Sequence, residues 1–371
     1  MKNYFNKTYK SKILKIYHIE KFGISYGVEV DKLGNIFIPE FSKGCIVKVN
    51  KNLNNVNFLK LKNNSLKKLS FLEKLFFNSK VNNYLKILKG DFLKPHDILI
   101  DKSKMYITQM GLGYLLGKGK VDILNLKGKL IKTIGSNLNS NKGMISPVML
   151  FIDSKSNLYV SEYGGNRILV FDKLGCFNYW IGNYNTNKRR NEVELNRNNN
   201  LLRVQLKKPH AIKIGPDKNF YLVDSWNHRI IKFNKKGKFL GWIGKQKNNK
   251  INYKWNFLGK SKAGNELGAF NVPVDLVFYK NFMYITDCNN HRIVKVTLKG
   301  RSIGWFGESV INSKKFWKNE KSKSKSSNSF FGFCNPYGMR IKNNTIYVAD
   351  KNNFRIKIIK SNKLFDKNVS I

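Results

Sequence analysis

The sequence predicts an all-β fold, a six-bladed β-propeller made of four-stranded antiparallel blades. The first observation is a long phrase that recurs along the chain at a nearly fixed period. Such a period marks an architecture in which each repeat is one supersecondary unit. The second is that each copy holds four short runs rich in Val, Ile, Tyr and Phe, separated by Gly, Asn and Asp turns. Four short strands per period is typical of a propeller blade. The period is clearest in four arginines, spaced 62, 63 and 63 residues apart: Arg167, Arg229, Arg292 and Arg355.

Each unit begins with a short apolar strand that follows a proline, as in PVMLFID from Pro147, PHAIKIG from Pro209 and PVDLVFY from Pro273. A second strand such as NLYVSE or NFYLVD comes next, followed by a tight polar turn. The third strand reads RILVF, RIIKF or RIVKV, and the fourth ends in W-I-G or W-F-G. Strands of this length, bounded by turn residues, favour antiparallel pairing.

The units begin near residues 25, 95, 147, 209, 273 and 336, which makes six blades in a single domain over residues 12–361. The last unit lacks its fourth strand, and the chain starts with an orphan strand at residues 12–23. We expect this N-terminal strand to complete the last blade, because closing the ring removes an exposed sheet edge. Four insertions interrupt the repeat, at residues 54–94, 183–208, 245–271 and 308–335.

Two of the polar turns read Asn227-His228-Arg229-Ile230 and Asn290-His291-Arg292-Ile293. These turns resemble the signature of the NHL repeat family, and the resemblance covers nearly the whole chain outside the insertions and the termini. It implies a propeller fold. It implies little about function, because one fold hosts many activities.

An acidic residue precedes each anchoring arginine by five positions, at the end of the second strand of the unit. We interpret these residues as an ion pair repeated in the blades rather than as ligand-binding groups. The signature histidines His228 and His291 are likewise interpreted as repeat consensus. The four predicted pairs are Glu162–Arg167, Asp224–Arg229, Asp287–Arg292 and Asp350–Arg355.

The position directly after the proline is a candidate functional site, because the first strands of a propeller line its central channel. His96, His210 and Tyr337 stand there in alternating blades. We expect their side chains to converge at one mouth of the channel, an arrangement that suits a divalent metal, zinc above all. Alternatively, the histidines hydrogen-bond water or backbone there. The remaining three blades place Tyr26, Val148 and Val274 at this position.

Pro95-His96-Asp97 and Pro209-His210 also resemble the Pro-His motifs of the peptidyl-hydroxyglycine amidating lyases. The resemblance implies a zinc ion held by three such motifs, with Tyr163 and Asp97 as acid–base groups. Tyr337 departs from the third motif. The stretch at residues 39–43, where that family has its catalytic arginine, contains none.

The composition is strongly basic, with 69 Lys and Arg against 23 Asp and Glu and a formal net charge of +46. Such a field favours anionic partners, although part of it is consistent with compositional drift. The four cysteines form no CxxC pair, so no disulfide framework or cysteine zinc site is indicated. The N-terminus has no apolar signal-peptide core, so we expect a cytoplasmic protein. We also expect a monomer.

Antiparallel geometry predicts that the starts of the first strands, the second-to-third turns and the insertions share one face. Lys and Arg outnumber Asp and Glu in every insertion, and two insertions interleave lysines with aromatic residues. This mixture suits single-stranded nucleic acid, although a solvated loop has the same composition. The candidate anion-binding residues are Lys43, Arg189, Arg190, Lys254, Lys321 and Lys323.

The favoured function is a binding scaffold that presents a basic face to an anionic partner: RNA, another acidic polymer or an acidic protein surface. The alternative is a zinc-dependent lyase-like enzyme with its site at the channel mouth. A third hypothesis is a protein-interaction scaffold that binds neither metal nor nucleic acid. The sequence contains no Gly-rich phosphate cradle, nucleophile elbow or paired-carboxylate pattern.

Overall fold

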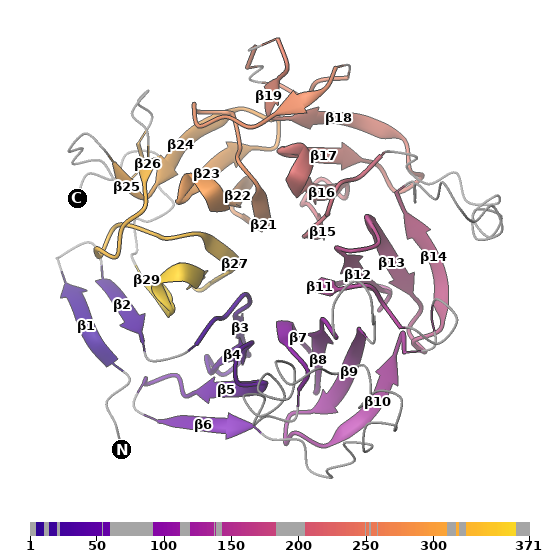
Figure 1. Ribbon diagram of the computed structural model, residues 1–371, viewed down its shortest axis with the longest axis vertical. Helices are drawn as coiled ribbons and strands as arrows, with labels where there is room; N and C mark the ends of the chain where they lie inside the picture. The colour runs from indigo at the N-terminus through magenta and orange to yellow at the C-terminus, as the bar shows by residue number, and fades with distance from the viewer. Residues whose placement is uncertain are drawn as a thin grey trace, which may run out of the picture.

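The computed structural model is a closed ring of six β-sheets arranged around a central axis (Figure 1), and the region along this axis, between the inner strands, is called the channel below. Five sheets have four antiparallel strands and the sixth has five, so the predicted all-β six-bladed propeller is confirmed. Among the described residues there is no helix of the length and hydrophobicity that a membrane crossing requires. The structure describes residues 5–10, 15–20, 23–53, 55–59, 92–111, 119–136, 138, 143–182, 205–248, 250–251, 254–257, 259–309, 317–318 and 324–360.

In blades 1 to 5 the chain runs outward from the channel, strand by strand, and in blade 6 the N-terminal strands β2 and β1 lie outside β29 (Figure 1). Blades 1 and 2 consist of β3 (Glu29–Val30), β4 (Ile36–Glu40), β5 (Cys45–Val49), β6 (Val56–Leu59), β7 (Pro95–Asp101), β8 (Lys104–Gln109), β9 (Lys120–Asn125) and β10 (Leu130–Ile134). Blades 3 and 4 consist of β11 (Pro147–Ile152), β12 (Leu158–Glu162), β13 (Arg167–Phe171), β14 (Phe177–Ile181), β15 (Ile212–Ile214), β16 (Phe220–Asp224), β17 (Arg229–Phe233) and β18 (Phe239–Ile243). Blades 5 and 6 consist of β21 (Pro273–Tyr279), β22 (Phe282–Asp287), β23 (Arg292–Thr297), β24 (Ser302–Phe306), β27 (Pro336–Lys342), β28 (Thr345–Asp350), β29 (Arg355–Lys360), β2 (Lys15–Ile19) and β1 (Phe5–Lys10).

The N-terminal strand closes the ring as the sequence predicts. Strand β2 pairs antiparallel with β29, with Ile16 opposite Ile359, and both side chains are fully buried. Strand β1 then pairs with β2 as a fifth strand that the sequence did not predict. Its sequence, FNKTYK, has too few apolar residues to show the alternation that marks a half-buried strand.

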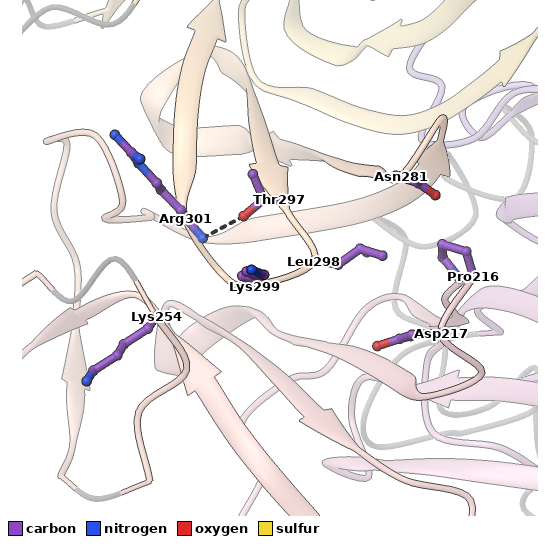
Figure 2. Close-up of a pocket in the computed structure, with 8 residues that line it drawn as sticks. All are labelled: Pro216, Asp217, Lys254, Asn281, Thr297, Leu298, Lys299 and Arg301. Atoms are coloured by element: carbon purple, nitrogen blue, oxygen red, sulfur yellow. Dashed lines mark hydrogen bonds between the residues drawn. The ribbon is translucent and has the colours of Figure 1, made fainter.

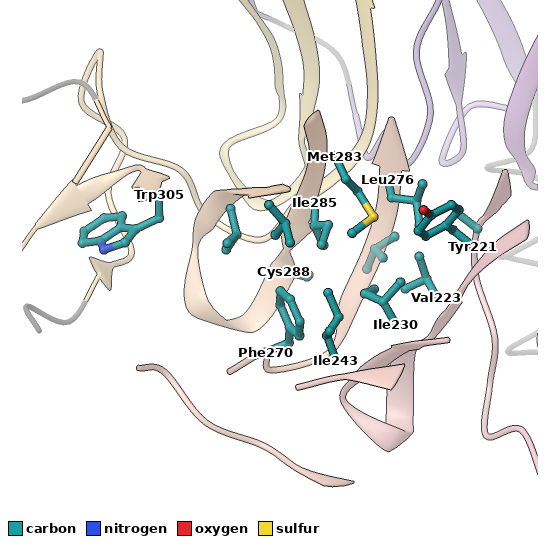
Figure 3. Close-up of a cluster of buried hydrophobic side chains, with 14 of the residues drawn as sticks. Tyr221, Val223, Ile230, Ile243, Phe270, Leu276, Met283, Ile285, Cys288 and Trp305 are labelled. Atoms are coloured by element: carbon teal, nitrogen blue, oxygen red, sulfur yellow. The ribbon is translucent and has the colours of Figure 1, made fainter. Parts of the chain in front are cut away.

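The hydrophobic core lies between neighbouring blades. Figure 3 shows the cluster where Val223 and Ile230 of blade 4 meet Leu276 and Ile285 of blade 5, with Trp305 at one end. All five side chains are fully buried. Burying one aliphatic side chain of this size contributes roughly 1.5–3 kcal/mol, so each blade depends on the next for its stability.

The four predicted acid–arginine pairs are present, with all four carboxylates and three of the arginines buried and the Arg229 side chain 14% exposed. In blade 5, Asp287 accepts a hydrogen bond from Arg292 Nε at 2.9 Å and from the backbone N–H of Asn271 at 2.7 Å. Arg292 also donates to backbone carbonyls of residues 265, 266 and 269. The pair therefore fixes the connection from blade 4 to blade 5 beside the turn between β22 and β23. The equivalent Nε–carboxylate distances are 2.5 Å for Arg167–Glu162, 2.8 Å for Arg229–Asp224 and 2.7 Å for Arg355–Asp350.

The signature histidines link one blade to the next. His228 and His291 both have a φ of 53°, in the left-handed region. Each follows a short 3₁₀ turn, η3 (Ser225–Asn227) or η4 (Cys288–Asn290). The His228 ring accepts a hydrogen bond from the backbone of Val272, and the His291 ring accepts one from Asn335, both at 3.1 Å. These positions are structural, and blade 6 ends the series with η5 (Lys351–Asn353) and Phe354.

Replacing Asp287 with alanine should lower the free energy of unfolding by about 3–5 kcal/mol, because it leaves the buried Arg292 guanidinium without its carboxylate. Urea unfolding of the full chain measures this change. The matched control is Asp217→Ala, which removes the more exposed Asp217–Lys232 pair and should cost about 1 kcal/mol or less. Equal losses in the two variants would contradict the structural role of Asp287.

Candidate functional site at the channel mouth

The inner strands bring together, at one end of the channel, four of the six side chains that occupy equivalent positions near the start of each blade. The Tyr26 and His96 rings stack with their centroids 4.4 Å apart. Tyr337 meets Tyr26 edge-on at 4.8 Å and His96 at 5.5 Å. On the far side of Tyr337, His210 lies at 5.4 Å. We call the face on which these inner strands begin the mouth face; it carries the turns 41–44, 163–166, 225–228, 288–291 and 351–354.

Hydrogen bonds within the cluster occupy three of its ring nitrogens. His210 Nε2 lies 2.6 Å from the Tyr337 hydroxyl, and His210 Nδ1 lies 2.8 Å from the Ser225 hydroxyl. His96 Nδ1 donates to the backbone carbonyl of Val148 at 3.1 Å. Both histidines are 2% exposed, so these contacts fix their ring orientations.

Burial sets the protonation of the cluster. It lowers the pKa of His210 to about 3, and the nearby Lys351 and Lys208 ammonium groups act in the same direction. Burial, His210 and Lys351 also lower the pKa of His96 well below its ordinary value. Burial raises the pKa of Tyr337 well above that of a free phenol. At neutral pH the cluster therefore consists of neutral imidazoles and a protonated phenol.

The hydrogen bonds of this cluster oppose a three-ligand zinc site. His210 Nε2 and the Tyr337 hydroxyl are hydrogen-bonded to each other at 2.6 Å, so a metal ion held by both would have to replace this hydrogen bond, and burial disfavours the phenolate form of Tyr337. Within the described residues, no group of three His, Cys, Asp or Glu side chains is arranged to hold a metal ion. The sequence-based expectation of a metal at His96, His210 and Tyr337 is not tested by the structure, and metal analysis of the purified protein tests it.

The two predicted acid–base residues lie in different surroundings. The Tyr163 ring contacts His210 edge-on at 5.1 Å and belongs to the mouth cluster. The Asp97 carboxylate instead accepts a hydrogen bond from Leu150 N–H at 3.0 Å. It also lies 3.6 Å from an Arg340 nitrogen. Asp97 thus ties its own blade to blade 3 and belongs to a second cluster within the channel.

This second cluster was missed by sequence reasoning. Arg340 on β27 pairs with Glu29 of β3 at 3.0 Å and with Asp275 of β21 at 3.2 Å, in addition to Asp97 of β7. Lys213 of β15 completes it, with its ammonium 3.1 Å from the Leu150 carbonyl. One arginine therefore connects four blades across the channel. The sequence did contain one signal. In two units a charged residue stands four positions after the proline that begins the unit, and these residues are Lys213 and Arg340.

Around the mouth cluster, lysines lie over aromatic rings. Lys351 Nζ is 5.1 Å from the Tyr26 ring centroid and 5.7 Å from that of Tyr337. Lys208 Nζ is 4.0 Å from the Trp226 centroid and 5.1 Å from that of Tyr163. Such distances are those of cation–π interactions. Trp226 and Phe354 are 40% and 50% exposed on this face, which is unusual for rings of their size.

The candidate anion-binding residues do not all share the mouth face. Lys43 is exposed there, in the turn between β4 and β5. Lys254 is on the opposite face, where it lines a pocket of about 810 Å³ with Lys299 and Arg301 (Figure 2). The expectation that every insertion stays at the mouth is therefore wrong for residues 254–256, because Asn256 bridges back onto Trp242 of β18. Arg189, Arg190, Lys321 and Lys323 lie outside the described residues.

Comparison with known proteins now adds a family signal at the C-terminal end. The NHL repeat model matches residues 333–359, which span β27 to β29. The sequence has no significant match among curated proteins.

Solved structures resemble the whole propeller. A catalytically inactive histidine-to-alanine form of virginiamycin B lyase from Staphylococcus aureus, with quinupristin, has a TM-score of 0.52 and 13% identity, covering 94% of this chain and 99% of that one. An auxiliary nutrient binding protein from Bacteroides thetaiotaomicron VPI-5482 has a TM-score of 0.54 and 12% identity, covering 91% and 69%. Identity this low shows a shared fold and carries no activity across.

The Asp97 carboxyl should make stability depend on pH. Burial raises its pKa from 3.8 to about 6, although Arg340 and Lys213 oppose the shift. The folded state then binds the proton more tightly than the unfolded state, so the free energy of unfolding falls as pH rises from about 4 to about 6. Asp97→Asn should remove about 3 kcal/mol of this fall. Urea unfolding of both proteins across this range measures it; parallel pH profiles would contradict the assignment.

Metal analysis tests the remaining zinc prediction. From the hydrogen bonds and protonation of the mouth cluster, we expect purified protein to carry no stoichiometric divalent metal. Elemental mass spectrometry of the wild type and of the His96→Ala/His210→Ala variant measures it. One zinc per chain that disappears in the double variant would contradict this expectation and favour the lyase-like alternative.

Proposed function

We propose that the chain is a binding propeller that holds an anionic polymer, single-stranded RNA in particular, on its mouth face. The observation that carries the proposal is the Lys208 ammonium within 5.1 Å of the centroids of both the Trp226 and Tyr163 rings, with Trp226 partly exposed. Sequence-tolerant proteins for single strands combine exposed rings that stack on bases with cations that contact phosphates.

The electrostatics of the mouth support an anionic partner. Lys351 and Lys208 both act on His210, and no carboxylate counts among the causes of its lowered pKa. The nearest acid of blade 1 on this face, Glu40, is 1% exposed and accepts hydrogen bonds from Ser42 and from the backbone of Lys43. Glu40 is therefore hydrogen-bonded within its own turn. The carboxylates at the other described turns of this face are paired with arginines, so the exposed ammonium groups contribute its net charge. These carboxylates are Glu162, Asp224, Asp287 and Asp350.

The geometry of the rings favours RNA over an acidic protein surface. Trp226 of blade 4 and Phe354 of blade 6 are exposed at equivalent turns, so two stackable rings flank the channel mouth. An acidic polypeptide would use the lysines alone, whereas a base-bearing strand uses the rings as well. The two partners therefore differ in how strongly binding depends on Trp226.

Trp226→Ala should weaken binding of a single-stranded RNA by about 1–3 kcal/mol, because one stacking platform is lost. Fluorescence anisotropy with a labelled RNA measures the affinity, and Trp226→Phe is the matched control that should retain most of it. Equal binding of wild type and Trp226→Ala would contradict the RNA proposal, and polyglutamate binding as tightly as RNA would favour a general acidic partner.

Salt dependence separates phosphate contacts from the rings. Lys207 lies with its ammonium 5.8 Å from the Trp226 centroid and is exposed. Lys207→Gln should reduce the slope of log affinity against log salt by about 0.7, the value for one phosphate contact to a single strand. Trp226→Phe should leave the slope unchanged. A slope near zero for the wild type would overturn the proposed function.

A further inference from the structure

The face opposite the mouth carries a second set of cations on rigid turns. We call it the turn face; it bears the loops at residues 215–219, 234–238, 280–281 and 297–301. In the loop at 234–238, the Asn234 side chain accepts hydrogen bonds from two backbone N–H groups at 2.9 Å, and Gly237 takes a φ of 77°. In the loop at 297–301, the Thr297 hydroxyl accepts a hydrogen bond from the backbone N–H of Arg301, and the Thr297 carbonyl accepts one from Gly300, which takes a φ of 88°. The intervening side chains take no part in holding either loop.

Exposed cations occupy these positions, whose side chains do not hold the loops. Lys235, Lys236 and Lys238 stand on one loop, and Lys299 and Arg301 stand on the next. Arg301 is exceptional, because the other five arginines in the described part of the chain are engaged in ion pairs. The fold therefore does not account for Arg301.

Lysines that serve the fold look different. Lys295 is 1% exposed with its ammonium 4.4 Å from the Phe282 centroid. Lys357 is fully buried with its ammonium 4.1 Å from the Phe333 centroid. Buried lysines over rings stabilise the blades, whereas the turn-face cations face water.

The cations lie around a concave surface between blades 4 and 5. The pocket of about 810 Å³ is lined by Lys254, Lys299 and Arg301 together with Asn281 and Leu298. In Figure 2 the Arg301 and Lys254 side chains lie on the side of the pocket away from Asp217 and extend in different directions, and Lys299 lies next to Leu298. The three cations are therefore spread along one side of the pocket.

The single carboxylate of this pocket is already neutralised. Asp217 lies 2.8 Å from the Lys232 ammonium and accepts hydrogen bonds from the Tyr221 hydroxyl at 2.8 Å and from Asn219 at 2.9 Å. These contacts hold its pKa below the ordinary value against the opposing effect of partial burial. A negatively charged ligand thus meets three cations and little repulsion.

We propose that this pocket binds the phosphodiester backbone of a nucleic acid, on a surface separate from the mouth face. Arginine matches a phosphate with paired N–H donors, and lysines add point charges. The residues that line the pocket include no aromatic ring, so the contacts are to phosphates rather than to stacked bases, and binding is independent of base sequence. The residues involved differ from those of the proposed function, so either proposal stands without the other.

The test neutralises the three cations, as Lys254→Gln/Lys299→Gln/Arg301→Gln. The probes are short RNA and DNA duplexes of one sequence, whose bases are not available for stacking on the mouth face. The triple variant should bind both duplexes about tenfold or more weakly at low salt, and its salt slope should fall by about two to three, because each phosphate contact contributes about 0.9. Fluorescence anisotropy across about 50–200 mM salt measures both quantities.

The matched control is Lys127→Gln/Lys129→Gln/Lys155→Gln, which removes the same charge from exposed loops of blades 2 and 3 on the same face. It should change duplex affinity by about twofold at most. Unchanged melting temperatures show that both variants are folded. Equal losses in the two triple variants would overturn the proposal, because binding would then follow overall charge. Duplex binding lost in Trp226→Ala but kept in the first triple variant would also overturn it, while leaving the proposed function intact.

Discussion

The buried carboxylate–arginine pair between the second and third strands of a blade is the interaction on which the mouth face depends. In blade 5 the carboxylate accepts a hydrogen bond from a backbone N–H of the connection that leads into the blade. The guanidinium donates hydrogen bonds to backbone carbonyls of the same connection. The turn between the pair is thereby fixed, so that His228 or His291 reaches the next blade. A charge pair of this kind is retained only where hydrogen bonds satisfy both partners. Trp226 belongs to such a turn, and its place beside Lys208 follows from the pair in blade 4.

The large positive charge of this chain divides into two populations. One stabilises the ring: arginines in buried pairs, lysines over buried rings, and Arg340, which joins carboxylates of three other blades across the channel. The other lies on exposed turns of both faces, where the charged side chains are not needed to stabilise the fold. A net charge of +46 is therefore a poor measure of binding surface. The exposed population, together with the rings and the concave surface beside it, carries the functional argument.

The repeat allowed much of the fold to be predicted, because period, strand order and the five-residue spacing of acid and arginine are local properties. The convergence of His96, His210 and Tyr337 could also be predicted, because each of them directly follows the proline at the start of its unit. The hydrogen bond from His210 to Tyr337 could not, because it depends on the channel radius. The Arg340 network joins residues more than two hundred positions apart, so the charged residues four positions after Pro209 and Pro336 do not by themselves name its partners. The backbone bridge between Asn256 and Trp242 of β18 has no signal in local sequence.

The central claim is that a preformed mouth face holds an anionic strand beside Trp226 and Lys208. Amide hydrogen exchange of the full chain, with and without a single-stranded RNA, tests it most directly, because it maps contact without altering any residue. The account predicts slower exchange at residues 205–208, 225–228 and 351–354 when RNA is bound. Protection confined to outer strands such as β10 and β14, with none in these segments, would contradict it.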